Sequence, residues 1–206
     1  MKLTIERAAL LKSLSHVQSV VERRSTVPIL ANVLLRGTKD GKLSLNASDL
    51  DLDIVETVAA DVSRPGETTA PAHTLYEIIR KLPDGSQVEF DYVGKDGLLT
   101  LRSGRSKFTL ACMPVEEFPT NSGGEMPYEF TVSGEELKRL IDRTRFAIST
   151  EETRYYLNGI YLHPATSDGV QVLRSVATDG HRLARFEVAL PDGARGMPGV
   201  IVPRKT

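Results

Sequence analysis

The sequence has little of the features on which several classes of protein depend. Its one cysteine, Cys112, leaves no second thiol for a disulfide within the chain. No apolar run approaches the roughly 20 residues that span a bilayer, and the first residues lack the apolar stretch of a signal peptide. Acidic and basic residues nearly balance, with a net charge of −1. We therefore expect a cytoplasmic globular protein with no membrane partner, in which Cys112 is a small buried hydrophobe.

The sequence also lacks the usual signatures of catalysis. His16, His73 and His163 show no metal-ligand spacing, and no glycine-rich phosphate loop or serine or cysteine nucleophile motif is present. Asp179-Gly180-His181 could suggest an acid–base pair, but no nucleophile motif accompanies it. We accordingly predict that the protein is not an enzyme and that it has no catalytic residue, no cofactor and no metal.

Three aspartates, Asp49, Asp51 and Asp53, occupy alternate positions in the sequence. The alternation of apolar and polar residues predicts a strand from 50 to 58, which would point the three carboxylates to one face. A calcium loop would need a glycine and a glutamate where Ile54 and Ala60 stand. The main interpretation is that the three aspartates lie on a solvent-exposed outer face of a sheet. The alternative is that they form the metal site of a hydrolase.

The order of elements along the chain is that of an α+β protein. Helices are predicted over 7–24, 73–82 and 133–146, the last with Ser133 as N-cap and Glu136 at the capping-box position. Leu137, Leu140, Ile141, Thr144 and Ile148 should form its inward stripe. Strands are predicted over 2–6, 32–35, 42–46, 50–58, 87–92, 98–103, 107–113, 130–132, 158–163, 170–177 and 183–188, with a linker over 116–127.

The two halves of the chain repeat one another. Leu30-Ala-Asn-Val33 matches Leu157-Asn-Gly-Ile160 at an offset of 127 residues, Ala47-Ser-Asp49 matches Ala177-Thr-Asp179 at 130, and Pro71-Ala-His-Thr74 matches Pro203-Arg-Lys-Thr206 at 132. The small drift is expected of loop insertions between copies of one fold. We predict a complete first domain at 1–122 and a second domain at 128–206 that is truncated at its C-terminal end.

Basic residues gather on the predicted helices. Over 7–24, 72–82 and 133–146 there are ten basic and five acidic residues, although acidic residues are in excess elsewhere. One interpretation is that the helices face a polyanion through weak contacts that are blind to base sequence. The other is that these are ordinary solvated helix faces.

The copies differ most at one turn. Ser48-Asp-Leu-Asp-Leu-Asp53 in the first copy becomes Thr178-Asp-Gly-His-Arg-Leu183 in the second. A glycine, a histidine and an arginine beside a leucine would suit a small surface pocket with an apolar floor and a polar rim. A turn with an exposed basic pair is the alternative.

Four segments resemble the bacterial DNA sliding clamp family, the β subunit of the replicative DNA polymerase III. They are Val27-Pro-Ile-Leu30, Leu101-Arg-Ser-Gly-Arg-Ser-Lys-Phe108, Arg154-Tyr-Tyr-Leu-Asn-Gly159 and Ala177-Thr-Asp-Gly-His-Arg-Leu183. The resemblance implies a clamp fold with two helices per domain on the inner face and antiparallel sheets outside. It also implies a homodimeric ring of six domains that encircles double-stranded DNA. This chain would supply domain one and most of domain two, without domain three, and would not close the ring alone.

The resemblance also implies site residues. Arg24, His73, Glu151, Tyr155 and Tyr156 would contact DNA, although His73 and Glu151 depart from the family pattern. A pocket for short peptide motifs of the DNA polymerase III α subunit, the clamp loader and repair proteins would use one set of residues, namely Leu157, Thr178, Gly180, His181, Arg182 and Leu183. Lys107, Phe108 and Leu110 would form the dimer edge. A peptide-binding scaffold with no role on DNA is the competing hypothesis.

Overall fold

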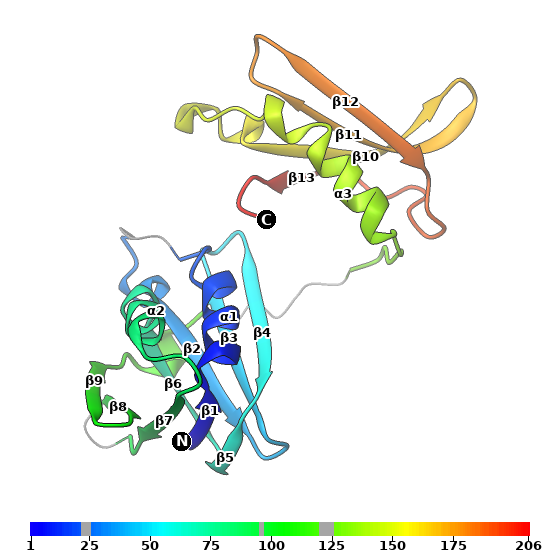
Figure 1. Cartoon of the computed structure of the whole chain (residues 1–206). Coiled ribbons are helices and arrows are strands. Elements are labelled where there is room, and N and C mark those ends of the chain that lie inside the picture. Colours follow the sequence, from blue (N-terminus) through cyan, green and yellow to red (C-terminus); the bar gives the residue numbers. More distant parts are fainter. Residues whose placement is uncertain (22–25, 95–96, 120–125) are drawn as a thin grey trace. The chain divides into compact units, whose positions relative to one another are not determined.

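The computed structural model describes residues 1–21, 26–94, 97–119 and 126–206, and it divides into two units, Met1–Ser122 and Gly123–Thr206 (Figure 1). The described residues form helices and three antiparallel sheets, which confirms the predicted α+β class. In this part of the chain no helix is both long enough and apolar enough to cross a membrane.

Unit 1 begins with a strand that turns directly into a helix. Both carboxylate oxygens of Glu6 accept the backbone N–H groups of Ala8 and Ala9, which caps the first turn of α1 (Arg7–Val17). The other elements of the unit are η1 (Pro28–Ala31), α2 (Ala72–Lys81), η2 (Val115–Glu117) and the strands β1 (Lys2–Glu6), β2 (Asn32–Thr38), β3 (Lys42–Ser48), β4 (Asp53–Ala59), β5 (Asp61–Arg64), β6 (Gly66–Pro71), β7 (Gln87–Tyr92), β8 (Leu98–Ser103) and β9 (Ser106–Ala111).

The core of unit 1 lies between its two sheets and two helices. One sheet has the order β5-β1-β7-β8-β9, and the other has the order β4-β3-β2-β6. Helices α1 and α2 pack against each other, as Figure 1 shows. Leu10 and Leu14 of α1 and Leu75 and Ile79 of α2 are fully buried in one cluster with the strands, so both apolar stripes are covered.

Unit 2 is smaller and has a single sheet. Ser133 caps α3 (Gly134–Asp142) by accepting the backbone N–H of Glu136, while its hydroxyl donates to the Glu136 carboxylate. The other elements are η3 (Arg145–Ala147), η4 (Glu152–Leu157) and the strands β10 (Gly159–Ser167), β11 (Val170–Thr178), β12 (Leu183–Ala189) and β13 (Val200–Pro203), which form a sheet in the order β12-β11-β10-β13.

The sheet of unit 2 repeats one sheet of unit 1 strand by strand. In the order β4-β3-β2-β6 each strand has its counterpart in β12-β11-β10-β13. Asn32 of β2 lies opposite Pro71 of β6, and Gly159 of β10 lies opposite Pro203 of β13. These partners are the residues that the sequence offsets connect, so the repeat extends to the strand register.

The first predicted helix and the predicted strand over 130–132 differ from the structure. The first helix ends at Val17, and residues 18–20 form a turn, so the prediction of a helix over 7–24 was too long. Residues 130–132 are not a strand; Phe130 and Val132 pack instead against the cluster that contains Leu140. A strand needs a partner for its ladder, and in unit 1 the corresponding β1 has β5 and β7 on its two sides.

The apolar stripe of α3 is only partly covered. Leu140 is 2% exposed, whereas Leu137 and Ile141, also predicted to face inward, are 47% and 38% exposed. Beside this face lies a cavity of about 610 Å³. Its lining includes the apolar residues Ile141, Phe146, Ile148, Ile160 and Val202 and the cations Arg145, Arg182, Arg204 and Lys205.

Candidate functional site

The turn between β11 and β12 holds its shape through its own polar groups. Thr178 Oγ1 donates to the Arg182 carbonyl at 2.7 Å and accepts the Gly180 N–H at 3.1 Å. Asp179 Oδ1 accepts the N–H groups of His181 and Arg182, both at 3.0 Å. The side chains of His181, Arg182 and Leu183 are left exposed, and Leu183 has 65% of its surface accessible. The turn therefore presents an apolar group next to a basic pair on a fixed backbone.

The first copy of the repeat contains the same turn. Asp49 Oδ1 accepts the N–H groups of Asp51 and Leu52 at 3.1 and 2.8 Å, and Ser48 Oγ accepts the Leu50 N–H at 3.1 Å. Leu50 has a φ of 78°, and its counterpart Gly180 has a φ of 90°. A leucine pays a steric cost in this left-handed region that glycine avoids. The two turns thus share a backbone but display different side chains.

This geometry overturns the prediction that Asp49, Asp51 and Asp53 lie along one strand. The strand β4 starts only at Asp53, because Asp49 draws the backbone N–H groups that follow it into a turn. Over the ranges that the structure describes, no group of three histidine, cysteine, aspartate or glutamate side chains could hold a metal ion.

Asp179 organises the turn instead of serving as an acid–base partner of His181. Hydrogen bonds from the backbone N–H groups of His181 and Arg182, aided by the Arg182 guanidinium at 2.9 Å, lower the pKa of Asp179 to about 2. Its carboxylate is ionised near neutral pH and its oxygens are already occupied, so it is a poor general base. The sequence pattern at Asp179-Gly180-His181 did not predict this role of the aspartate.

The loop before β10 brings two exposed tyrosines together. Tyr155 and Tyr156 are 79% and 54% exposed, and their rings meet edge to face with centroids 5.7 Å apart. Leu157 ends η4 and is half-buried. Within the same segment Glu151 pairs with Arg154, at 3.2 Å between Oε2 and Nε. Exposed aromatic faces beside charged groups are a suitable surface for nucleic acid.

Arg154 connects this loop to the turn. A Cβ built on Gly180 would lie 3.1 Å from Nη1 of Arg154, so the guanidinium rests against the turn. Arg154 opens the segment Arg154-Tyr-Tyr-Leu-Asn-Gly159 but is not among the predicted site residues. Its signal was its position directly before the tyrosine pair.

Arg24 and His73 are two of the residues expected to contact DNA. Arg24 lies outside the described residues. His73 is half-buried at the start of α2, where Nδ1 lies 3.0 Å from Gln18 Oε1 and Nε2 lies 3.0 Å from the Val21 carbonyl oxygen. Both ring nitrogens are therefore engaged within unit 1, and a phosphate would have to compete for them.

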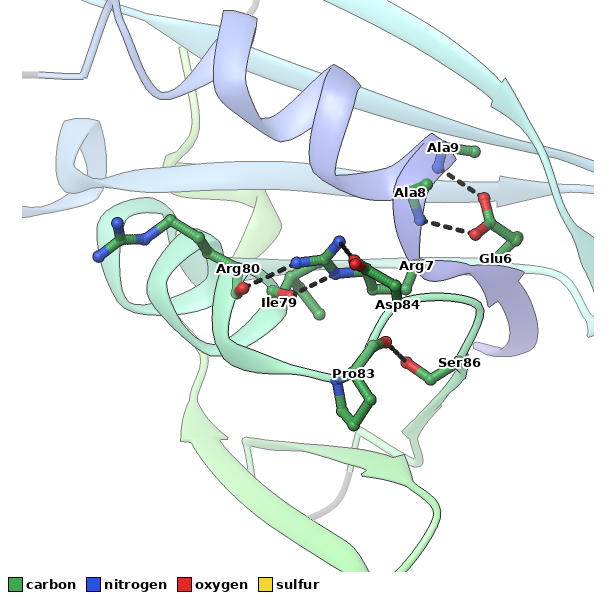
Figure 2. Close-up of polar contacts among 9 residues, drawn as sticks. All are labelled: Glu6, Arg7, Ala8, Ala9, Ile79, Arg80, Pro83, Asp84 and Ser86. Atoms are coloured by element: carbon green, nitrogen blue, oxygen red, sulfur yellow. Dashed lines mark hydrogen bonds and ion pairs between the residues drawn. The ribbon is translucent and has the colours of Figure 1, made fainter.

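Part of the positive charge counted on the predicted helices is used inside the protein. The guanidinium of Arg7 donates to the carbonyls of Ile79 and Arg80 at 3.1 and 2.7 Å and to Asp84 at 2.5 Å (Figure 2). Arg7 thus closes the C-terminal end of α2, as Figure 2 shows, and only 12% of its side chain is exposed.

Other helix cations also have partners in the protein. Arg80 pairs with Glu77, Lys138 and Arg145 pair with Asp142, and the Arg139 guanidinium lies 5.1 Å from the centre of the Phe186 ring. These contacts support the interpretation of solvated and internally paired helix faces more than the charge count alone suggested.

The residues expected at the dimer edge lie on β9, at one end of the five-stranded sheet. Lys107 is exposed, Phe108 is half-buried and Leu110 is buried. All three belong to unit 1, together with His73, whereas the tyrosine pair and the turn from Thr178 to Leu183 belong to unit 2.

Comparison with known proteins gives a consistent result. A family model described as the N-terminal domain of the DNA polymerase III β subunit matches residues 1–122, and the model of its central domain matches residues 131–206. The β sliding clamp of Caulobacter vibrioides is 58% identical over 206 residues, and that of Escherichia coli K12 is 42% identical over 208. All of this chain is covered, and it spans about half the length of these relatives, 55% and 54%.

Solved structures agree with the sequence matches. A crystal structure of the Caulobacter crescentus β sliding clamp has a TM-score of 0.92 and 56% identity, covering all of this chain and 54% of that one. A Bartonella birtlesii sliding clamp bound to griselimycin has a TM-score of 0.92 and 49% identity, again over all of this chain and 54% of that one. The clamp fold is thereby confirmed, and the chain belongs to the family of the bacterial DNA polymerase III β subunit, the sliding clamps.

Proposed function

We propose that this chain acts as part of a non-catalytic sliding clamp in the cytoplasm. In the complete assembly, a homodimeric ring would encircle duplex DNA and tether the replicative polymerase and other replication and repair proteins. The observation that carries the proposal is the repeat, in which two matched sheets with the same strand register build a chain of the clamp family. A ring of such modules holds DNA by enclosing it, so each contact can be weak and blind to base sequence.

Within this proposal, three surfaces have separate roles. Lys107, Phe108 and Leu110 on β9 would pair with the partner subunit. Arg24, His73 and the segment from Glu151 to Tyr156 would face DNA. Leu157 and the turn from Thr178 to Leu183 would hold a short peptide, with an apolar anchor against the leucines and a polar rim of His181 and Arg182.

The test of the ring uses a chimera in which this chain replaces the matching part of the Caulobacter vibrioides clamp, to which it is 58% identical. The chimera should stay on closed circular DNA through gel filtration and slide off after the circle is linearised. Failure to be retained, by a chimera that folds and dimerises, would refute the clamp function.

The peptide surface is tested in the same chimera. Replacing His181 and Leu183 with alanine should weaken binding of a polymerase-derived peptide by about tenfold or more, as expected for a small hot spot, without opening the ring. The matched control is Asp51→Ala with Asp53→Ala, at the equivalent positions of the unit 1 turn. Equal peptide affinity in both double variants would refute the assignment.

A peptide-binding scaffold with no role on DNA is the second candidate. The internal pairing of Arg7 favours it, because this largely buried cation is not free to meet phosphates, and the exposed Arg80 and Lys138 would have to exchange a carboxylate partner for a phosphate. Retention on circular DNA separates the two candidates, since a scaffold would bind the peptide and leave the circle.

A further inference from the structure

Glu151 and Arg154 form an ion pair at the junction of two proposed surfaces. They are three residues apart, with Oε2 and Nε separated by 3.2 Å and about half of each side chain exposed. Arg154 interrupts the helical geometry of η4, with φ −111° and ψ 53°. From this bend the side chain extends to the turn after β11.

The far end of Arg154 lies over the turn itself. Its Nη1 approaches the position where a side chain on Gly180 would begin, at 3.1 Å. The other arginine at this turn, Arg182, pairs with Asp179 at 2.9 Å, and its guanidinium lies 5.6 Å from the centre of the Phe146 ring. Arg154 and Arg182 are therefore each held by a carboxylate of the chain.

We propose that Glu151 is an internal competitor for Arg154 and thereby sets the preference of the turn for acidic peptides. In the free protein, the Glu151 carboxylate lies 3.2 Å from Nε of the guanidinium and offsets part of its charge. A peptide carboxylate that reaches the turn competes with it, because both anions draw on the charge of the one guanidinium whose Nη1 lies beside Gly180. Glu151 therefore lowers the affinity of the turn for acidic peptides selectively and does not change the binding of the apolar anchor. This inference rests on the proposed peptide surface.

The expected effect is small but specific. An exposed ion pair in water contributes little, so releasing Arg154 should raise the affinity for an acidic peptide by about two- to fivefold at low salt. A peptide in which the acid is replaced by its amide should not gain. The difference should shrink as salt screens the charges, with a screening length of about 10 Å at 0.1 M.

The experiment uses the 206-residue chain and two synthetic heptapeptides with leucine anchors, identical except for one aspartate or asparagine. Their affinities are measured by NMR titration, following the Gly180 amide and the Arg154 Nε–H. Glu151→Gln should raise the ratio of aspartate to asparagine affinity by about two- to fivefold. Arg154→Ala should abolish the preference, and Arg154→Lys should restore part of it, since lysine keeps the charge but not the fork.

A matched control is Glu77→Gln in α2, which removes the carboxylate of another exposed pair three residues apart, Glu77–Arg80. An unchanged ratio in Glu151→Gln, a preference that survives Arg154→Ala, or an equal rise in Glu77→Gln would each overturn the inference. Binding that also ignores His181→Ala with Leu183→Ala would instead overturn the peptide surface. The two failures are therefore distinguishable.

Discussion

Replacing Arg7 with alanine should remove the group that fastens the end of α2 to the start of α1. The guanidinium reaches two backbone carbonyls, those of Ile79 and Arg80, and the carboxylate of Asp84 (Figure 2). The contact with Ile79 is partly buried, whereas Asp84 has 95% of its side chain exposed. The backbone contacts should therefore stabilise the fold more than the ion pair with Asp84 does.

The magnitude follows from these environments. The partly buried bond from a charged donor contributes about 1.5 kcal/mol and the more exposed one less. The ion pair adds about 0.3 kcal/mol, and the buried alkyl stem adds about 2 kcal/mol. Freeing the arginine side chain returns about 2 kcal/mol of conformational entropy. We expect Arg7→Ala to lower the free energy of unfolding of unit 1 by about 2 kcal/mol, or its melting temperature by about 8 °C.

Scanning calorimetry suits this measurement, because the chain has no tryptophan to report on unfolding. The control is Asp84→Ala, which keeps both backbone contacts and should cost no more than about 0.5 kcal/mol. Equal losses in the two variants, or a loss below about 0.5 kcal/mol in Arg7→Ala, would refute the reasoning.

Three further predictions concern unit 2. Gly180→Ala should cost about 1 kcal/mol, because alanine is strained at a φ of 90°; an unchanged urea midpoint would contradict this. The pKa of Asp179, lowered from 3.8 to about 2, means that the turn keeps its stabilisation above pH 3.8 and loses it as the pH falls toward 2. The ¹³C shift of the Asp179 side-chain carboxyl should therefore be constant from pH 7 to 4, and a titration of this carbon centred near pH 4 would argue against the hydrogen bonds. Leu140→Ala should cost about 3 kcal/mol by chemical denaturation and Ile141→Ala less than half as much, because only Leu140 is buried; equal losses would contradict the burial.

Local pattern and internal repetition were enough to predict most of the fold. The offsets between the copies connect residues with matching strand partners, such as Asn32 with Gly159. The same alignment also contained evidence against the predicted strand over 50–58. Gly180 marks a turn in the second copy, and Leu50 stands at the matching place in the first. Leucine favours regular structure, so the composition of the first copy concealed a turn that the second made visible.

Contacts between distant parts of the sequence were harder to predict. Arg7 and the end of α2 are more than seventy residues apart, and nothing in the pattern near Arg7 distinguishes it from a solvated helix cation. Arg154 likewise reaches Gly180 only because the sheet brings the two loops together. Leu137 and Ile141 have the spacing of an inward stripe, but the spacing does not show how much of the stripe a neighbour covers.

The cavity beside α3 has a consequence for the cooperativity of the molecule. The sheets of the two units have matching strand orders, yet the first packs against a large core and the second borders an open cavity lined by apolar and cationic side chains. An amide proton exchanges with solvent when local unfolding breaks its hydrogen bond, and the packing that covers the strand sets how often this happens. Amide protons of β10 should therefore exchange with deuterium faster than those of β2, although the two ladders correspond. The two units therefore share one strand arrangement but should protect their amide protons from exchange for different times.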